Sequence, residues 1–230
     1  YYIGDTALLK RPAVAIVGAR KANQYAKQTT FSLASALAKR GACVISGAAM
    51  GIDAMAHRGA GAENTIAVVA NGLDIRYPKV NASLIAQIEK EGLVLSQFEE
   101  GFSARPWSFP VRNELVVALA DAVVLAQADE NSGTMISANL ARQQGKSLYV
   151  LPHRLEESKG TQQLVKNAQA ELIHDLEALA SMFAQIGAPE PQNDELLEYA
   201  KTNPTHEQLV QRFGDKVFEY EFEGKIAVKD

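Results

Sequence analysis

Six short apolar runs recur along the first two thirds of the chain, and each is followed by a turn and a stretch with helical spacing. The runs cover residues 14–17, 43–45, 66–69, 93–95, 122–125 and 148–151. Each run is continuously apolar rather than alternating, which is typical of strands buried on both faces of a sheet. Strands that alternate with helices at this spacing are joined by right-handed crossovers. The sequence therefore predicts an α/β fold with a Rossmann-like, doubly wound, mostly parallel sheet.

Two of the intervening stretches show helical spacing clearly. Residues 24–40 place apolar side chains on one face and stop at Gly41, and residues 81–91 do the same before Gly92. Glycine directly after the last apolar position is a common helix stop. We expect one helix in each stretch.

The alternation of strands and helices stops after Pro152, which indicates a second, smaller unit. A polar segment with two prolines at residues 187–193 predicts a linker. It separates a Rossmann-like domain at residues 1–186 from a unit at residues 194–230, where clustered apolar residues indicate short helices and a closing strand at 224–228. This order predicts a small winged-helix-like C-terminal domain. The chain starts without Met on what looks like the end of a strand, so we expect further chain before it.

Charge is distributed unevenly along the chain. The formal net charge is −4, yet residues 1–152 carry 15 Lys and Arg against 12 Asp and Glu, and residues 192–230 carry 5 against 9. The first domain is thus mildly basic, which suits a local phosphate site. No apolar run approaches the ~20 residues that cross a bilayer. The single cysteine cannot form an internal disulfide, so we expect a cytoplasmic protein without membrane contact.

Three turns that follow predicted strands are rich in glycine and small polar residues. Parallel strands end at one edge of their sheet, where such folds bind ligands. Glycine lets backbone N–H groups approach an anion, and a helix N-terminus adds partial positive charge. The residues expected to hold phosphate are Gly18, Arg20 and Lys21 in the first turn, Ser46 and Gly47 in the second, and Ser132, Gly133 and Thr134 in the third.

Turns of this kind can also serve purposes other than binding the phosphate of a nucleic acid. Any parallel sheet needs tight turns, and Asp53 suits the cap of the helix beginning at Ala54 better than a ligand role. A dinucleotide site requires G-x-G-x-x-G and an acid roughly 20 residues later, but Gly18 lacks the second glycine and residues 6–52 contain no Asp or Glu. A triphosphate P-loop string is also absent. The residues therefore argue against a dinucleotide site and against a P-loop site.

Residues 102–113 combine aromatic and basic side chains between the fourth and fifth strands. Aromatic rings stack bases while arginine engages phosphate, which favours an unpaired nucleic-acid strand. Two prolines lead us to expect a loop here, with Arg105, Phe109, Arg112 and Asn113 at the binding edge. The alternative is that Trp107 and Phe109 pack under the sheet edge and Arg112 pairs with Glu99 or Glu100.

These motifs together resemble the DNA-processing protein A (DprA, or Smf) family of bacterial natural transformation. The resemblance runs from about residue 4 to residue 152 and rests on four segments in consistent order, at 17–20, 46–57, 109–113 and 132–138. It also extends to residues 220–226, which look like the small C-terminal domain of many members.

The resemblance implies a homodimer that binds single-stranded DNA, protects it, and helps load the RecA recombinase, without enzymatic activity or a cofactor. It implies that Arg20 grips phosphate and Phe109 stacks a base. It further implies that Gly47, Gly133 and Thr134 line the pocket, and that Arg112, Asn113 and Lys146 complete the groove. Binding of duplex DNA remains open.

The chain departs from the family pattern at three positions. Ala19 replaces a usual Ser or Thr, Asn23 replaces another, and Glu114 stands where a further Arg is common. DNA affinity is therefore expected to depend more on Arg20, Lys21 and Lys146. The acidic C-terminal unit suits protein interaction or self-association better than DNA contact.

Enzymatic alternatives find less support in the residues. Asp53 and His57 are one helical turn apart, but the other histidines show no ligand spacing with them, so no metal site is expected. The main rival is a nucleotide-processing hydrolase on a related Rossmann-like fold. That class needs a catalytic Glu where this chain has Ser137, and a pure assembly scaffold would leave Arg20 and Phe109 without a role.

Overall fold

The computed structural model describes residues 1–184 and, further on, residues 195–200, 202, 204–214, 216, 217, 220 and 226. The chain divides into two compact units, residues 1–188 and residues 189–230. In these described parts, no helix is long and apolar enough to cross a membrane.

The first unit is built on one eight-stranded sheet with the order β1-β5-β4-β3-β2-β6-β7-β8. All neighbouring strands are parallel except β1, which pairs antiparallel with β5 at the edge. The strands are β1 (Tyr2–Gly4), β2 (Ala13–Val17), β3 (Cys43–Ser46), β4 (Thr65–Val69), β5 (Leu93–Ser96), β6 (Ala122–Leu125), β7 (Ser147–Val150) and β8 (Glu171–Leu172).

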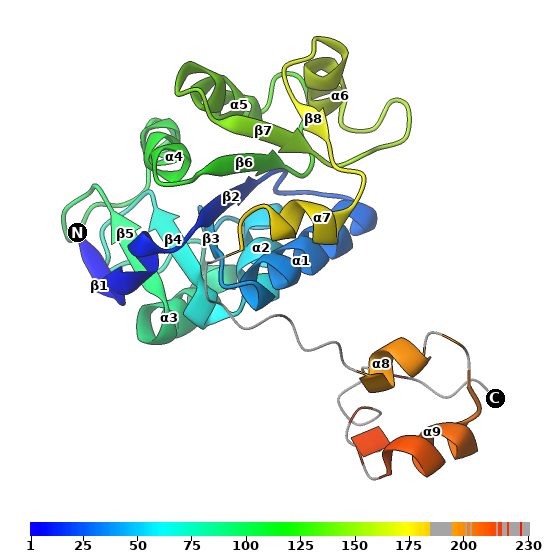
Figure 1. Cartoon of the computed structure of the whole chain (residues 1–230). Coiled ribbons are helices and arrows are strands. Elements are labelled where there is room, and N and C mark those ends of the chain that lie inside the picture. The colour runs from blue at the N-terminus through cyan, green and yellow to red at the C-terminus, as the bar shows by residue number, and fades with distance from the viewer. Residues whose placement is uncertain are drawn as a thin grey trace. The chain divides into compact units, whose positions relative to one another are not determined.

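Helices cover both faces of this sheet (Figure 1). One face carries α1 (Gln24–Lys39), α2 (Ile52–Ala60), α3 (Ala82–Glu91) and α7 (Leu176–Ser181). The other carries α4 (Ser108–Ala118), α5 (Gly133–Gln143) and α6 (Lys159–Lys166). Short 3-10 helices lie at Thr6–Lys10, Ala62–Asn64 and Lys79–Asn81.

Alternate residues of each central strand supply the two cores. In β2, Val14 and Ile16 face α1, whereas Ala15 and Val17 face the layer of α4 to α6, and all four are buried. This is why the strands are continuously apolar in sequence. The Rossmann-like, doubly wound sheet is confirmed.

The crossover from β5 through α4 to β6 reverses the direction in which strands are added. β2 therefore lies between β3 and β6, and the strand order changes direction between β2 and β6. Open α/β sheets bind ligands at the carboxyl ends of the strands beside such a switch point. The turns after β2, β3 and β6 all lie at this edge.

Two predictions about the first unit are wrong in detail. Residues 108–113 belong to α4, not to a loop. The strands also continue after Pro152, because the two-residue β8 pairs with β7.

The second unit is described in part. Its helices are α8 (Glu195–Ala200) and α9 (His206–Phe213), and Leu196, Leu209 and Val217 form its buried cluster. Thr205 begins α9 with a capping box to Gln208. The predicted linker at 187–193 and, apart from Ile226, the predicted strand at 224–228 lie outside the described residues.

Candidate functional site

A shallow pocket lies over the carboxyl ends of β2, β3 and β4. It encloses only about 20 Å³, room for little more than one water molecule. Its lining comes from Arg20, Gly47, Ala49, Met50, Ala70, Asn71, Tyr77, Pro78, Phe109 and Arg112. Four of the predicted site residues, from three separate segments, thus meet in one place.

An exposed arginine and a half-buried ring form the outer wall of this pocket. The Arg20 guanidinium carbon lies 5.0 Å from the centroid of the Phe109 ring, which is cation–π geometry. Tyr77 adds a second ring, tilted at 6.3 Å from Phe109. The pocket therefore presents a positive charge and aromatic surface to solvent together.

Arg112 forms the floor of the pocket and is 5% exposed. Its guanidinium donates to the carbonyls of Gly47 and Val68, the latter at 2.7 Å, and its Nε donates to Asn113 Oδ1 at 2.9 Å. The suggested pairing with Glu99 or Glu100 is wrong, because backbone carbonyls take those donors. Burial lowers the pKa of Arg112, and the charge of Asp53 opposes that shift. Arg112 thus joins α4 to the ends of β3 and β4.

Side chains of α2 accept hydrogen bonds from the backbone of the turn after β3. Asp53 accepts from the N–H groups of Gly47 at 3.1 Å and Ala49 at 3.4 Å, and the Ala48 N–H donates to His57 Nε2 at 3.3 Å. These donors are therefore already used and do not face a phosphate. The expected cap role of Asp53 is wrong, because α2 begins at Ile52 with Gly51 as its N-cap.

Burial shifts the pKa values of Asp53 and His57, the two ionisable side chains of α2 that bond to this turn. It raises the pKa of Asp53, against the opposing charge of Arg112. It lowers the pKa of His57 to about 3. Thr65 donates its hydroxyl proton to the Val44 carbonyl, so His57 Nδ1, 2.7 Å away, is the donor to Thr65 Oγ1. His57 is a neutral structural residue with both nitrogens bonded.

Two glycines let the turns after β2 and β3 lie against each other. A Cβ on Gly18 would come within 2.6 Å of the Ile52 side chain, and one on Gly51 within 2.4 Å of the Ala19 carbonyl oxygen. Gly51 also has φ +80°. The packing of these two turns therefore requires glycine at residue 18.

Other predicted site residues are placed differently from what the sequence suggested. Ser46 is fully buried and its hydroxyl donates to the Ile16 carbonyl at 2.6 Å. Lys146 precedes β7 and so lies at the amino edge of the sheet, where Nζ reaches the Ala118 carbonyl at 3.4 Å. We correct both assignments: Ser46 has no exposed atom for DNA, and Lys146 cannot complete a groove at the opposite edge. Lys21 and Arg105 are exposed, and neither of them lines the pocket.

The start of α5 keeps the features expected of an anion site. Among the described residues, the N–H groups of Gly133 and Thr134 have no acceptor, and nothing lies within 4 Å of a Cβ built on Gly133. Ser132 Oγ is buried without a hydrogen-bond partner in this described part of the chain. These residues follow β6 but do not line the pocket around Arg20.

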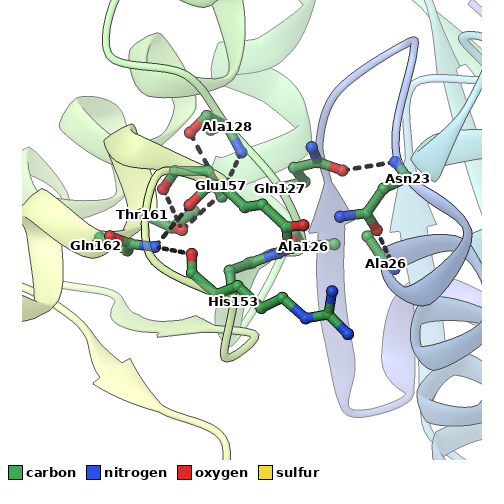
Figure 2. Close-up of polar contacts among 11 residues, drawn as sticks. Asn23, Ala26, Ala126, Gln127, Ala128, His153, Glu157, Thr161 and Gln162 are labelled. Atoms are coloured by element: carbon green, nitrogen blue, oxygen red, sulfur yellow. Dashed lines mark hydrogen bonds and ion pairs between the residues drawn. The ribbon is translucent and has the colours of Figure 1, made fainter.

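A larger cavity of about 550 Å³ lies over the ends of β2, β6 and β7 (Figure 2). Its lining is Asn23, Tyr25, Pro152, His153, Arg154 and Glu157. Sequence reasoning missed this set, and it also missed Tyr77 and Asn71 in the first pocket. Their positions are scattered among loops, and only the sheet order brings them together.

Comparison with known proteins assigns the family. The family model for DNA recombination-mediator protein A matches residues 1–184. The chain belongs to this family. Protein Smf of Synechocystis sp. is 36% identical over 177 residues, which are 75% of this chain and 44% of that protein. DNA processing protein DprA of Streptococcus pneumoniae is 34% identical over 154 residues, 66% of this chain and 54% of that protein. The chain thus spans about half the length of these relatives.

Solved structures of family members share the fold. DNA processing protein A from Helicobacter pylori, described with its single-stranded DNA binding mode, superposes with a TM-score of 0.77 and 44% identity, covering 79% of this chain and 85% of that one. The DprA structure from Streptococcus pneumoniae gives 0.74 and 32%, covering 79% and 65%. A molybdenum cofactor binding protein from Rippkaea orientalis, with a TM-score of 0.54 and 17% identity, shares the fold alone.

Proposed function

We propose that this chain binds single-stranded DNA at the carboxyl edge of its sheet and carries out no chemistry on it. The observation that carries the proposal is the Arg20 guanidinium over the Phe109 ring, because an unpaired strand presents phosphates and bases side by side. On binding, a base takes the face of Phe109 and Arg20 turns to a phosphate. Lys21, Arg105, Gly133 and Thr134 supply further donors along the edge.

Family membership and the solved Helicobacter pylori relative support this proposal. By the same reasoning we propose that the protein acts in the cytoplasm during natural transformation, as a homodimer that protects incoming strands and helps load RecA. The rival hydrolase needs a carboxylate at residue 137, where α5 carries a buried serine. Release of free base from a nucleoside monophosphate would nevertheless favour that rival.

The proposal is tested by fluorescence anisotropy with a labelled single strand, a duplex control and a series of salt concentrations. We expect the single strand to be preferred and its affinity to fall as salt rises. Arg20→Ala should weaken binding and reduce the salt slope by about 0.7, the loss of one phosphate contact. Phe109→Ala should cost ~1–3 kcal/mol with little change in slope.

Matched controls separate these effects from general damage. Arg142→Ala removes an exposed arginine near the end of α5, at the amino edge, and Phe31→Ala removes a partly exposed ring from α1. Both should bind as the parent does. Failure of the parent to bind at micromolar concentration, or equal losses in variants and controls, would refute the proposal.

A further inference from the structure

The larger cavity lies on the other side of the turn that carries Arg20. Arg20 lines the first pocket, and Asn23, three residues later, lines the second. Their Cα atoms are at most about 11 Å apart along the chain, which about three stacked nucleotides span at roughly 3.4 Å each. A strand that leaves Arg20 can therefore enter this cavity.

A buried histidine atom in the cavity wall lacks a hydrogen bond. His153 Nε2 lies 2.7 Å from the Ala126 carbonyl, which can only accept, so Nε2 carries a proton. Within the described residues Nδ1 is buried without a hydrogen-bond partner, and its side chain is fully buried. Neither ring nitrogen is exposed, so His153 supports the cavity wall through its bond to the Ala126 carbonyl.

A carboxylate stands next to Nδ1 of this histidine. Glu157 Oε2 lies 3.9 Å from His153 Nδ1 and the side chain is 42% exposed. A ligand here meets the two oxygens of the Glu157 carboxylate, which suit a group with two adjacent donors. The Glu157 carboxylate opposes the charge of Arg154, which lines the same cavity. The N-terminus of α1 is already closed by Asn23, whose Oδ1 accepts from the Ala26 N–H at 2.7 Å.

An exposed ring borders the same cavity. Tyr25 is 45% exposed and meets His153 edge-on, with ring centroids 5.7 Å apart and planes at 86°. Asn23 and Gln127 are fixed beside it by the bond from the Asn23 N–H to Gln127 Oε1 at 2.8 Å (Figure 2). A planar group can thus stack on Tyr25 while its edge reaches Glu157.

We propose that this cavity is a second base subsite, and that it takes a guanine of the bound strand. The guanine edge presents N1–H and the N2 amino group side by side, the pair of donors that a carboxylate accepts with both oxygens. Thymine places one N–H between two carbonyl oxygens, which Glu157 repels. The proposal rests on the proposed single-strand binding and adds base preference to it.

The test uses the full chain and three labelled strands of equal length. One is all thymidine, one carries isolated deoxyguanosines in thymidine, and one carries deoxyinosine at the same places, which lacks only the N2 amino group. We expect the guanosine strand to bind about fivefold more tightly than the inosine strand, because inosine lacks the amino group that donates the second hydrogen bond to Glu157.

Two variants locate the effect. Glu157→Gln should remove the difference between the guanosine and inosine strands, and it should bind the thymidine strand at least as tightly as the parent does, because the carboxylate that repels the thymine carbonyls is gone. Tyr25→Ala should weaken the guanosine strand most. The matched control is Glu156→Gln, one residue away, whose carboxylate pairs with Lys159 at 2.6 Å outside the cavity lining; it should keep the preference.

The outcomes are distinguishable from failure of the proposed function. Binding of the thymidine strand without any guanosine preference overturns the subsite and leaves the proposed function standing. A preference that survives Glu157→Gln also overturns it, because the guanine is then held elsewhere. A parent protein that binds none of the strands overturns both proposals.

Discussion

At the scale of single residues, buried polar side chains hold the turns at the carboxyl edge of the sheet, whereas exposed ones can contact a ligand. Arg112, Asp53 and His57 direct their hydrogen bonds at backbone groups of the turn after β3. Replacing any of them would leave buried partners unsatisfied, which costs more than the net gain of the bonds themselves. Arg20 is free of that role and can exchange its ring contact for a phosphate.

The buried imidazole of His57 makes stability depend on pH. Burial lowers its pKa from 6.5 to about 3, so between these values the unfolded chain takes up a proton that the folded protein does not. The free energy of unfolding should be unaffected by His57 above pH 6.5. It should fall as the pH drops toward 3, by roughly 1.4 kcal/mol per pH unit.

NMR of the histidine rings tests this assignment without a variant that risks unfolding. The His57 ring should keep the chemical shifts of a neutral imidazole from pH 7 down to pH 5. Urea titrations at the same pH values measure the accompanying loss of stability. A His57 ring that becomes protonated between pH 7 and pH 5 contradicts the buried, doubly bonded state.

At the scale of elements, the start of α4 determines where its side chains lie. Pro110 occupies the third position of α4, where its missing N–H has no intrahelical acceptor to lose. The prolines therefore allow a helix where they suggested a loop. Being helical, α4 places Phe109 in the outer wall and Arg112 in the floor, three residues apart on one side.

Replacement by alanine should lower the free energy of unfolding at one glycine of this edge and leave it nearly unchanged at another. Gly51→Ala forces φ +80° on an L-residue and brings its Cβ within 2.4 Å of a backbone oxygen, so we expect a loss of about 2–3 kcal/mol or more in the free energy of unfolding. Gly133→Ala meets no atom within 4 Å and should stay within about 0.5 kcal/mol of the parent.

Chemical denaturation of both variants gives the comparison directly. If Gly133→Ala keeps its stability yet binds a single strand more weakly, the start of α5 approaches the DNA backbone closely. Equal stabilities of the two variants would contradict the packing described for the turns after β2 and β3.

At the scale of the whole molecule, the two units have separate cores. The three clusters of the first unit contain no residue beyond 183, and the small cluster of the second unit contains none before 196. Residues 192–230 carry 5 Lys and Arg against 9 Asp and Glu, which equals the whole net charge of −4, so this charge is separate in sequence from the unit proposed to bind DNA.

A fragment of residues 1–188 should therefore fold and bind on its own. We expect its melting temperature to lie within about 2 °C of the first transition of the full chain, because each domain buries its own core. Its affinity for a single strand should change less than twofold, roughly 0.4 kcal/mol. Calorimetry and anisotropy on the fragment and the full chain provide the comparison, and an unfolded or non-binding fragment would refute it.

The sequence alone determined the sheet, because strands buried on both faces must be continuously apolar and this pattern needs no tertiary information. It also predicted Arg20 and Phe109 as site residues from their types and motif positions, and the structure places the two side chains in contact. Only the tertiary structure decided the other roles. The buried donors of Ser46, Gly47 and Arg112 are used in hydrogen bonds within the protein. The direction of β7 places Lys146 at the amino edge of the sheet. The strand order brings Tyr25, His153 and Glu157 together around one cavity. Such outcomes depend on which groups meet across the fold, and the spacing of residues along the chain does not record that.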